Sequence, residues 1–352
     1  MYNHKIVLNK TKKEIKYKTT QPVYKVNVIF FDIKGNMDRR KFITNSALVG
    51  AAGSAALATP SLSQGKDKLT MVTTWGRGSF GVHDAAQRFA DNCNAISGGT
   101  LEIDLKANGE LVSGTAAAFD AMTSGTADAA HFAMYYYIGQ NPTTAFYTAV
   151  PFGMIATEIN GWIRHGGGQE LWDELGDEFG LKNFMAGNSG VQMGGWFNKE
   201  INSPDDFKGL KMRIPGLGGM MMSKLGLSVV GVPGGQIYEN LINGTIDATE
   251  WVGPWNDERS RFYEAAKYYY WPGCHEPGTL ITLGCNKSWL TSLSKTDQMI
   301  IEHASTVQNE RMLTEYNANN GAALQRLVND HGVAVSYTHL RAHETVLDLV
   351  CR

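Results

Sequence analysis

The sequence predicts an α/β protein with two lobes and a ligand cleft. Strand-like and helix-like segments alternate from about residue 68, an order that predicts parallel strands with helices on both faces. The chain has 352 residues, of which 43% are hydrophobic and 19% are charged, so it can bury a core in each of two lobes. Glycines beside several strand ends let the backbone come close to a ligand.

The first half of the predicted fold has a β-α-β-α-β order. Strands are expected at residues 68–75, 101–105 and 127–133, and helices at residues 83–96 and 116–124. A glycine-rich loop separates the first strand from the first helix. Parallel strands in this order place their carboxyl ends at one edge of the sheet.

The second half continues the alternation with shorter segments. Helical patterns occupy residues 158–179, 218–225, 236–242 and 296–331, and strand patterns occupy residues 181–185, 193–197, 211–214, 228–232, 246–250 and 280–285. The glycine run at residues 166–168 falls inside the first of these helices and can kink or break it. The pattern therefore favours a second α/β lobe.

Composition excludes some classes of function and leaves one cysteine question open. The formal net charge is −2, so no basic excess indicates nucleic-acid binding. The four cysteines are scattered, with neither CxxC nor metal-ligand spacing. Cys93, Cys274 and Cys285 fit either buried thiols or a set that includes one disulfide.

Three stretches carry the side chains that could bind a small anion: NSGVQMGGW (188–196), GLKMRIP (209–215) and GTIDATEW (244–251). Together they offer Arg213, Glu250, the amides of Asn188 and Gln192, and the indoles of Trp196 and Trp251. An arginine fork suits a carboxylate, and a carboxylate with an amide oxygen suits a hard cation. Arg213 in a surface salt bridge, Glu250 in an ordinary ion pair and Trp196 in a core are the structural alternatives.

These stretches resemble the solute receptors of tripartite ATP-independent periplasmic (TRAP) transporters, and most of all the α-keto-acid receptors among them. The resemblance runs from about residue 66 to about residue 331, with long matches in HFAMYYYIGQNP (131–142), GNSGVQMGGWF (187–197), TIDATEWVG (245–253) and YYYWPG (268–273). It implies a two-lobed, periplasmic-binding-protein-like α/β fold. We expect lobe I at 66–157 plus 250–285, and lobe II at 158–249 plus 286–334.

The resemblance also implies a function without catalysis. It indicates a periplasmic receptor that captures a small α-keto monocarboxylate, such as pyruvate, and delivers it to the TRAP membrane permease. A bridging Na⁺ is expected, with Ca²⁺ as the alternative. A calcium-dependent receptor for lactate or another 2-hydroxy acid is the second interpretation, and a secreted enzyme on the same fold is a remote one. The relatives suggest a homodimer for the untruncated protein.

Residue roles implied by the resemblance centre on a cation and a carboxylate. Arg213 holds the ligand carboxylate, while Gln192, Glu250 and the main-chain carbonyl of Trp251 hold the cation. Glu276 matches a further acidic position near the metal. His275 departs from the pattern, because the nearest relatives carry a bulky aromatic residue there, and this leaves the pocket size open.

Further ligand contacts are expected from residues 135–137 and from the first stretch. Neighbours in a strand face opposite ways, so at most two of the three tyrosines can reach the cleft. We favour Tyr137 as a cleft hydroxyl, beside Tyr136. Asn188 can donate to a keto oxygen, and Trp196 is either a ligand wall or core.

Enzymatic motifs are weak. Ser189 lies between glycines in a way that only faintly resembles a serine-protease nucleophile turn, and the surroundings lack the all-β pattern and the His/Asp partners. The loop at 76–81 has part of a G-x-G-x-x-G order, but no acidic residue follows at the distance of about 20 residues that a dinucleotide site needs. We expect no enzyme.

The two ends are expected to lie outside the natural fold. Residues 1–36 are interpreted as translated upstream DNA before a start at Met37, and residues 37–62 as a signal peptide of the twin-arginine type, with Arg39 and Arg40 before an apolar run. Residues 335–352 resemble read-through of a sequencing adapter, so C-terminal helices would be missing and the histidines at 339 and 343 carry no metal argument.

Overall fold

The computed structural model of this protein describes residues 7–8, 15–16 and 67–337. The chain divides into two compact units, residues 1–63 and 64–352. In the first unit, β1 (Val7–Leu8) pairs antiparallel with β2 (Ile15–Lys16). The expected signal peptide, the rest of the expected upstream stretch and residues 338–352 of the expected adapter lie outside the described residues. Among the described helices, none has the length and apolar character needed to span a membrane.

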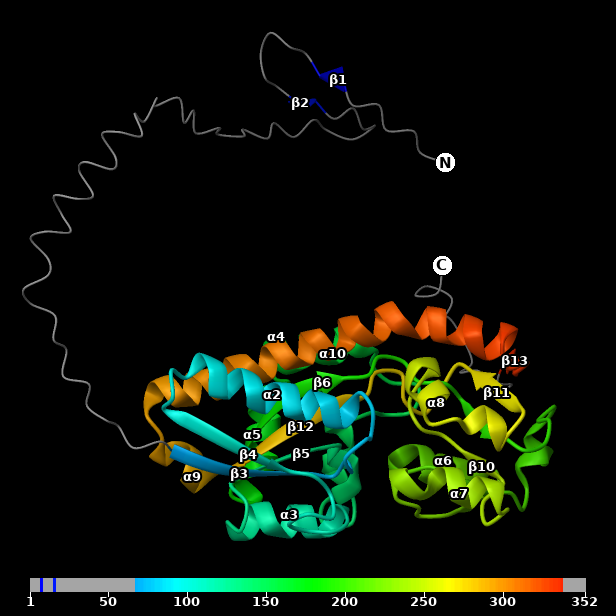
Figure 1. Cartoon of the computed structure of the whole chain (residues 1–352), viewed down its shortest axis with the longest axis horizontal. Coiled ribbons are helices and arrows are strands. Elements are labelled where there is room, and N and C mark those ends of the chain that lie inside the picture. The colour runs from blue at the N-terminus through cyan, green and yellow to red at the C-terminus, as the bar shows by residue number, and fades with distance from the viewer. Residues whose placement is uncertain (1–6, 9–14, 17–66, 338–352) are drawn as a thin grey trace, which may run out of the picture. The chain divides into compact units, whose positions relative to one another are not determined.

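A five-stranded sheet forms the first part of the second unit (Figure 1). Its order is β4 (Leu101–Lys106), β3 (Asp67–Thr73), β5 (Ala129–Phe132), β12 (Leu280–Asn286) and β6 (Leu181–Asn188). The first three strands are parallel, as the sequence predicts. Because β12 runs antiparallel to both β5 and β6, the complete sheet is mixed.

Helices cover both faces of this sheet. They are α2 (Val82–Ile96), α3 (Thr115–Ser124), α4 (Ala156–His165), α5 (Gly168–Glu178) and α9 (Lys287–Ser292). One core contains Phe89 of α2, and the core on the other face contains Phe119 of α3 and Trp172 of α5. The expected long helix is broken at Gly167, which has φ 84° at the start of α5, a conformation that favours glycine.

A six-stranded sheet forms the second part of this unit. Its order is β13 (Ala334–Tyr337), β11 (Tyr268–Trp271), β7 (Gly195–Phe197), β10 (Ala248–Thr249), β8 (Lys211–Arg213) and β9 (Ser228–Val229). Strand β7 is antiparallel to both of its neighbours, whereas the other pairs are parallel. The accompanying helices are α6 (Gly216–Lys224), α7 (Ile237–Ile242) and α8 (Pro254–Arg259).

Single helical turns link several of these elements. They are the 3-10 helices η1 (Met134–Tyr137), η2 (Pro142–Tyr147), η3 (Pro204–Phe207), η4 (Gly234–Gln236) and η5 (Phe262–Glu264). In η1, the three consecutive tyrosines follow β5 directly. The chain therefore leaves the first sheet in a helical turn, and not in an extended strand end.

The lobe boundaries differ from those expected. Strand β6 lies in the range assigned to lobe II but pairs with β12 in the first sheet, and β11 lies in the range assigned to lobe I but belongs to the second sheet. The long helix α10 (Lys295–Asn329) contacts both parts, since it packs on β6 and on α8 (Figure 1). The chain therefore passes between the two sheets more often than the expected lobe ranges imply.

The described cysteines are free thiols. Cys93, Cys274 and Cys285 are all buried and unpaired with one another, so the buried-thiol interpretation is confirmed for this part of the chain. Burial raises the pKa of the Cys274 thiol to about 11, and the thiol therefore stays protonated at neutral pH.

Candidate functional site

A pocket with apolar and polar walls collects residues from strand ends of both sheets. Its lining is Trp75, Val82, Ala133, Tyr135, Tyr136, Ser189, Gln192, Arg213, Trp251, Val252, Thr279 and Ile281. Most of these residues stand at the end of a strand or just beyond it, which is where open α/β sheets place their ligand sites. The free volume inside the pocket is about 20 Å³, which is close to that of one water molecule, so a larger ligand requires the walls to move apart.

Arg213 and Glu250 contact each other at the second sheet. Arg213 ends β8, where it is in register with Thr249 of the parallel strand β10. Its Nη1 donates to the Glu250 carboxylate and, at 3.1 Å, to the Glu250 main-chain oxygen. Its Nε donates to the Val232 oxygen at 3.3 Å, and the guanidinium carbon lies 5.3 Å from the Trp251 ring centroid. Four contacts therefore fix the plane of the guanidinium.

The electrostatic surroundings keep Arg213 charged. Burial is the largest single influence and lowers the pKa of its guanidinium, but Glu250 and, after it, Tyr136, Tyr135 and Glu276 together raise the pKa by more, so the net change is upward. Arg213 is only 5% exposed. A buried cation held in one orientation can bind a carboxylate without first losing a hydration shell.

Glu250, His275 and Glu276 form a buried cluster next to this ion pair. Each offers one ligand atom, and the three atoms lie within 4.8 Å of one another. His275 Nε2 is 3.5 Å from Glu250 Oε2. Neither atom has a hydrogen-bond partner among the described residues, although both residues are less than 5% exposed.

Gln192 joins the cluster through a short hydrogen-bonded chain. Its Nε2 donates to Thr279 Oγ1 at 3.1 Å, and that hydroxyl donates to Glu276 Oε2 at 2.7 Å. The main chain ties the same loops together, since Gln192 N donates to the Glu276 oxygen at 3.1 Å. Gln192 Oε1 is buried without a partner in the described structure. The amide is thus oriented with its oxygen left free.

The surroundings shift the pKa of Glu276 and of His275 upward. Burial, and after it the negative charge of Glu250, raise the pKa of Glu276 to about 7. Burial is the largest single influence on His275 and lowers its pKa, but Glu250 and Glu276 together raise it by more, so the net change is upward. A cluster that raises the proton affinity of its own groups also attracts other cations.

These atoms fit a bound cation. Glu250 Oε2 and Gln192 Oε1 are buried oxygens without partners, and leaving such groups unpaired costs about 1–3 kcal/mol each. A second carboxylate, Glu276, lies beside them. Carboxylate and amide oxygens are the ligands that hard cations take in proteins, so the donor set agrees with the cation expected from the sequence.

Three of the expected ligand residues do not line the pocket. Tyr137 is fully buried in the first core, with its ring 4.4 Å from that of Phe119 and 4.9 Å from that of Phe132. The reason is the helical turn: in η1, side chains repeat every three residues, so Tyr137 follows Met134 into the core while Tyr135 and Tyr136 face the pocket. The expectation of a strand end placed the wrong tyrosine in the cleft.

Trp196 and Asn188 also lie outside the pocket lining, although Asn188 Nδ2 is buried without a partner in the described structure. Trp196 stacks on Tyr269 with 3.9 Å between ring centroids and donates its indole N–H to Asp257 at 2.9 Å. This is the core alternative left open by the sequence. Asn188 is fully buried, and its Oδ1 accepts from Gly190 N at 2.8 Å, so its side chain shapes the turn that leads to Gln192.

Sequence reasoning missed Tyr135, Ser189 and Thr279 as lining residues, and His275 as a member of the acidic cluster. Thr279 had a readable signal, because it follows Gly278 just before β12. A Cβ on Gly278 would lie 2.5 Å from Ala156 N, which shows how tightly this turn packs. For His275 the sequence offered a weaker indication of a site residue, namely that it directly precedes the acidic residue Glu276.

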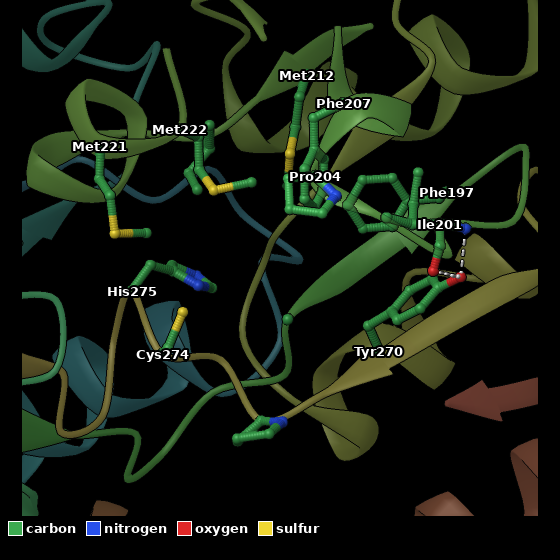
Figure 2. Close-up of a pocket in the computed structure, with 13 residues that line it drawn as sticks. Phe197, Ile201, Pro204, Phe207, Met212, Met221, Met222, Tyr270, Cys274 and His275 are labelled. Carbon is green, nitrogen blue, oxygen red and sulfur yellow. Dashed lines mark hydrogen bonds between the residues drawn. The ribbon is translucent and has the colours of Figure 1, made fainter. Parts of the chain in front are cut away.

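An apolar pocket lies on the other side of His275. Its lining includes Phe197, Phe207, Met212, Met221, Met222, Tyr270, Cys274 and His275. Figure 2 shows His275 and Cys274 near Met221 and Met222 of α6. His275 therefore has apolar neighbours on one side and the carboxylate of Glu250 on the other.

Comparisons with known proteins agree with this fold. The family model for bacterial extracellular solute-binding proteins, family 7, matches residues 71–351. A monocarboxylate 2-oxoacid-binding periplasmic protein of Nostoc sp. (strain PCC 7120) is 41% identical over 297 residues, which cover 82% of this chain and 81% of that protein.

Two solved structures of TRAP periplasmic solute binding proteins resemble the chain over most of its length. The protein from Colwellia psychrerythraea, with bound calcium and pyruvate, is 40% identical with a TM-score of 0.75. The protein from Pseudoalteromonas atlantica T6c, with bound sodium and pyruvate, is 38% identical with a TM-score of 0.73. Each match covers 78% of this chain and 83% of the other.

These matches confirm the α/β fold and the resemblance to TRAP solute receptors that the motifs indicated. They also confirm a binding protein in place of an enzyme, because the family and the relatives are binding proteins. The chain belongs to family 7 of the bacterial extracellular solute-binding proteins, the DctP family.

Proposed function

We propose that this protein is a periplasmic receptor that captures a small 2-oxo monocarboxylate, such as pyruvate, together with a cation. The observation that carries the proposal is the contact between Arg213 and Glu250, with the unpaired oxygens of Glu250 and Gln192 beside it. The relatives named for 2-oxoacid binding, and those with bound calcium or sodium and pyruvate, support it.

Arg213 provides the fixed positive charge for the ligand carboxylate. Its Nη1 and Nε are already bonded to Glu250 and Val232, while Nη2 has no hydrogen-bond partner among the described residues. Nη2 is therefore the group that donates to the ligand. Since Trp251 lies against the guanidinium, the donor cannot swing away, and this orientation lowers the entropic cost of binding.

Gln192 Oε1 and Glu250 Oε2 would hold the cation, with the Trp251 carbonyl and Glu276 as further ligands. A bound Na⁺ or Ca²⁺ supplies positive charge to the carboxylate and keto oxygens of the ligand. Thr279 positions both Gln192 and Glu276 through its hydroxyl. Tyr135 and Tyr136 close the pocket from the first sheet, and their hydroxyls stay protonated because burial raises the pKa of each.

Movement of the two sheets relative to each other would open and close the pocket, because its walls come from both. Closure excludes water and strengthens each charge contact. The closed receptor would then deliver its ligand to the TRAP membrane permease. Export by the twin-arginine route fits Arg39 and Arg40. Replacing both arginines with lysine should leave the protein in the cytoplasm, and unchanged periplasmic recovery would refute that route.

Ligand titration tests the proposal. Purified protein, freed of divalent metal with a chelator and of Na⁺ by dialysis into a sodium-free potassium buffer, is titrated with pyruvate and with L-lactate by isothermal titration calorimetry, with Ca²⁺, with Na⁺ and with neither. The proposal expects saturable pyruvate binding that requires a cation and leaves pyruvate chemically unchanged. Tighter binding of lactate would reassign the ligand to a 2-hydroxy acid, and formation of a product would show an enzyme.

A further inference from the structure

A nitrogen ligand distinguishes this site from one built of oxygen alone. His275 Nε2 is buried, lacks a hydrogen-bond partner in the described structure and faces Glu250 Oε2 at 3.5 Å. Na⁺ and Ca²⁺ take oxygen ligands and gain little from an imidazole. Divalent ions of the first transition series, in contrast, bind imidazole well together with carboxylates.

We propose that His275 makes this a site for a divalent transition metal such as Mn²⁺, Co²⁺ or Zn²⁺, held by His275, Glu250 and Glu276. The proposal rests on the proposed function, because it names the cation that accompanies the captured acid. It adds a ligand residue and a class of metal to the oxygen donors already described.

The distances are compatible with such a site. The three ligand atoms lie within 4.8 Å of one another. Ligands of a tetrahedral metal, each about 2.1 Å away, are about 3.4 Å apart. The three side chains would therefore have to move closer together to share one ion.

The surroundings hold His275 in position for this role. A Cβ on Gly218 of α6 would lie only 2.9 Å from His275 Cβ, so the glycine lets α6 pack directly on the histidine. Cys274 and Met221 line the apolar pocket beside it (Figure 2). Thr279 fixes Glu276 through a 2.7 Å hydrogen bond. Supporting contacts of this kind orient metal ligands and raise metal affinity.

Charge balance favours a divalent ion over Na⁺. When both acids are ionised and His275 is neutral, as a metal-binding imidazole must be, Glu250, Glu276, His275 and Arg213 together carry one net negative charge. A divalent cation with a monocarboxylate brings one net positive charge and neutralises the buried site. Na⁺ with the same ligand brings none and leaves a buried negative charge, which is unfavourable at low dielectric.

Metal titration of the whole chain tests the inference. Metal-stripped protein is titrated with Mn²⁺, Co²⁺, Zn²⁺ and Ca²⁺ by calorimetry, and the visible absorption of bound Co²⁺ is recorded. We expect the transition ions to bind more tightly than Ca²⁺, and His275→Phe to weaken them by roughly tenfold or more, since even supporting residues of metal sites have effects of this size. The variant should also change the Co²⁺ spectrum.

Controls separate this inference from the proposed function. The first control, His275→Gln, keeps a polar side chain and so separates loss of the imidazole from any packing defect caused by phenylalanine. The second, His303→Gln, measures adventitious metal binding at an exposed histidine. Transition-metal affinity and a Co²⁺ spectrum that are unchanged in both His275 variants would overturn the inference. Pyruvate binding supported by Ca²⁺ in the same samples would then still uphold the proposed function. Pyruvate binding with no cation at all would refute that function, while the metal titration would still test His275.

Discussion

Two buried carboxylates near the second sheet differ in how their oxygens are used. Asp257 accepts from Tyr269 OH at 2.7 Å and Trp196 Nε1 at 2.9 Å on one oxygen, and from Val252 N at 3.3 Å on the other. Glu250 pairs with Arg213 through one oxygen, but its Oε2 has no hydrogen-bond partner among the described residues. Both acids are about equally buried.

This difference separates a structural acid from a binding acid. Natural structures satisfy nearly all buried polar groups, so an exception calls for a functional explanation. Both carboxylate oxygens of Asp257 accept hydrogen bonds within a packed core. Glu250 Oε2 accepts none in the described structure, and Gln192 Oε1 and His275 Nε2 are likewise buried without a partner. Of these two acids, the one with an unsatisfied oxygen is the one that contacts the pocket residue Arg213.

The largest expected effect on ligand affinity comes from removing the Arg213 guanidinium, which pairs with Glu250. Arg213→Ala should weaken pyruvate binding by more than 100-fold, because losing one partner of a buried charge contact costs about 2–5 kcal/mol. Calorimetry measures the affinity. The change also leaves Glu250 unpaired, so thermal melting must accompany it.

Arg213→Lys provides the matched control, since it keeps the charge and loses the fork. We expect it to restore the melting temperature more completely than the affinity. Near-normal affinity in the alanine variant would contradict the role assigned to Arg213.

The structural acid should control stability and its pH dependence. Burial raises the pKa of Asp257 to about 7, against 3.8 for the ordinary side chain, although its hydrogen bonds oppose the shift. A raised pKa means that the folded protein holds the proton more tightly than the unfolded chain. The free energy of unfolding should therefore rise as the pH falls from about 8 to about 5, by up to about 1.4 kcal/mol per pH unit.

Asp257→Asn should remove this contribution. Chemical denaturation of wild type and variant at several pH values gives the difference, and taking the difference cancels the similar contribution of Glu276. Pyruvate affinity should stay within about threefold, because residues without shared partners act independently. A variant with the wild-type pH profile would show that Asp257 is not the titrating group.

The sequence predicted the elements better than their assembly. Strands expected at residues 101–105, 127–133 and 280–285 all appear, with ends shifted by a few residues. Their periodicity is local information. The partner of β6 is not local, because β12 lies about 100 residues further along the chain, and so the lobe boundaries differed.

The site shows the same division. The motifs indicated Arg213, Glu250 and Gln192 as site residues. In the structure Arg213 contacts Glu250, and Arg213 and Gln192 line the same pocket. Tyr137 was expected in the cleft but lies in the core, because a 3-10 turn stands where a strand end was expected. His275 acquired its position through contact with Gly218, 57 residues away, and no local pattern encodes such a contact.

The smallest expected effect on ligand affinity comes from Tyr137→Phe, which tests whether Tyr137 lies in the core and not in the pocket. Its hydroxyl is buried without a partner in the described structure, so Tyr137→Phe should be neutral or stabilising by up to about 1 kcal/mol. Thermal melting and pyruvate calorimetry give both readouts. Tyr136→Phe serves as the comparison from the pocket side, and a tenfold loss of affinity confined to the Tyr137 variant would return that residue to the site.

The most direct test of the account is the cation dependence of pyruvate affinity in wild type and in Glu250→Gln. The substitution keeps the shape of the side chain and removes the charge that pairs with Arg213 and faces the cation site. We predict that removing the cation, with a chelator for Ca²⁺ and with a sodium-free buffer for Na⁺, weakens binding by at least about 100-fold in wild type, and that adding the cation back restores affinity there but not in the variant. Equal affinity and equal metal dependence in the two proteins would contradict the central claim that Glu250 holds a cation against the captured acid.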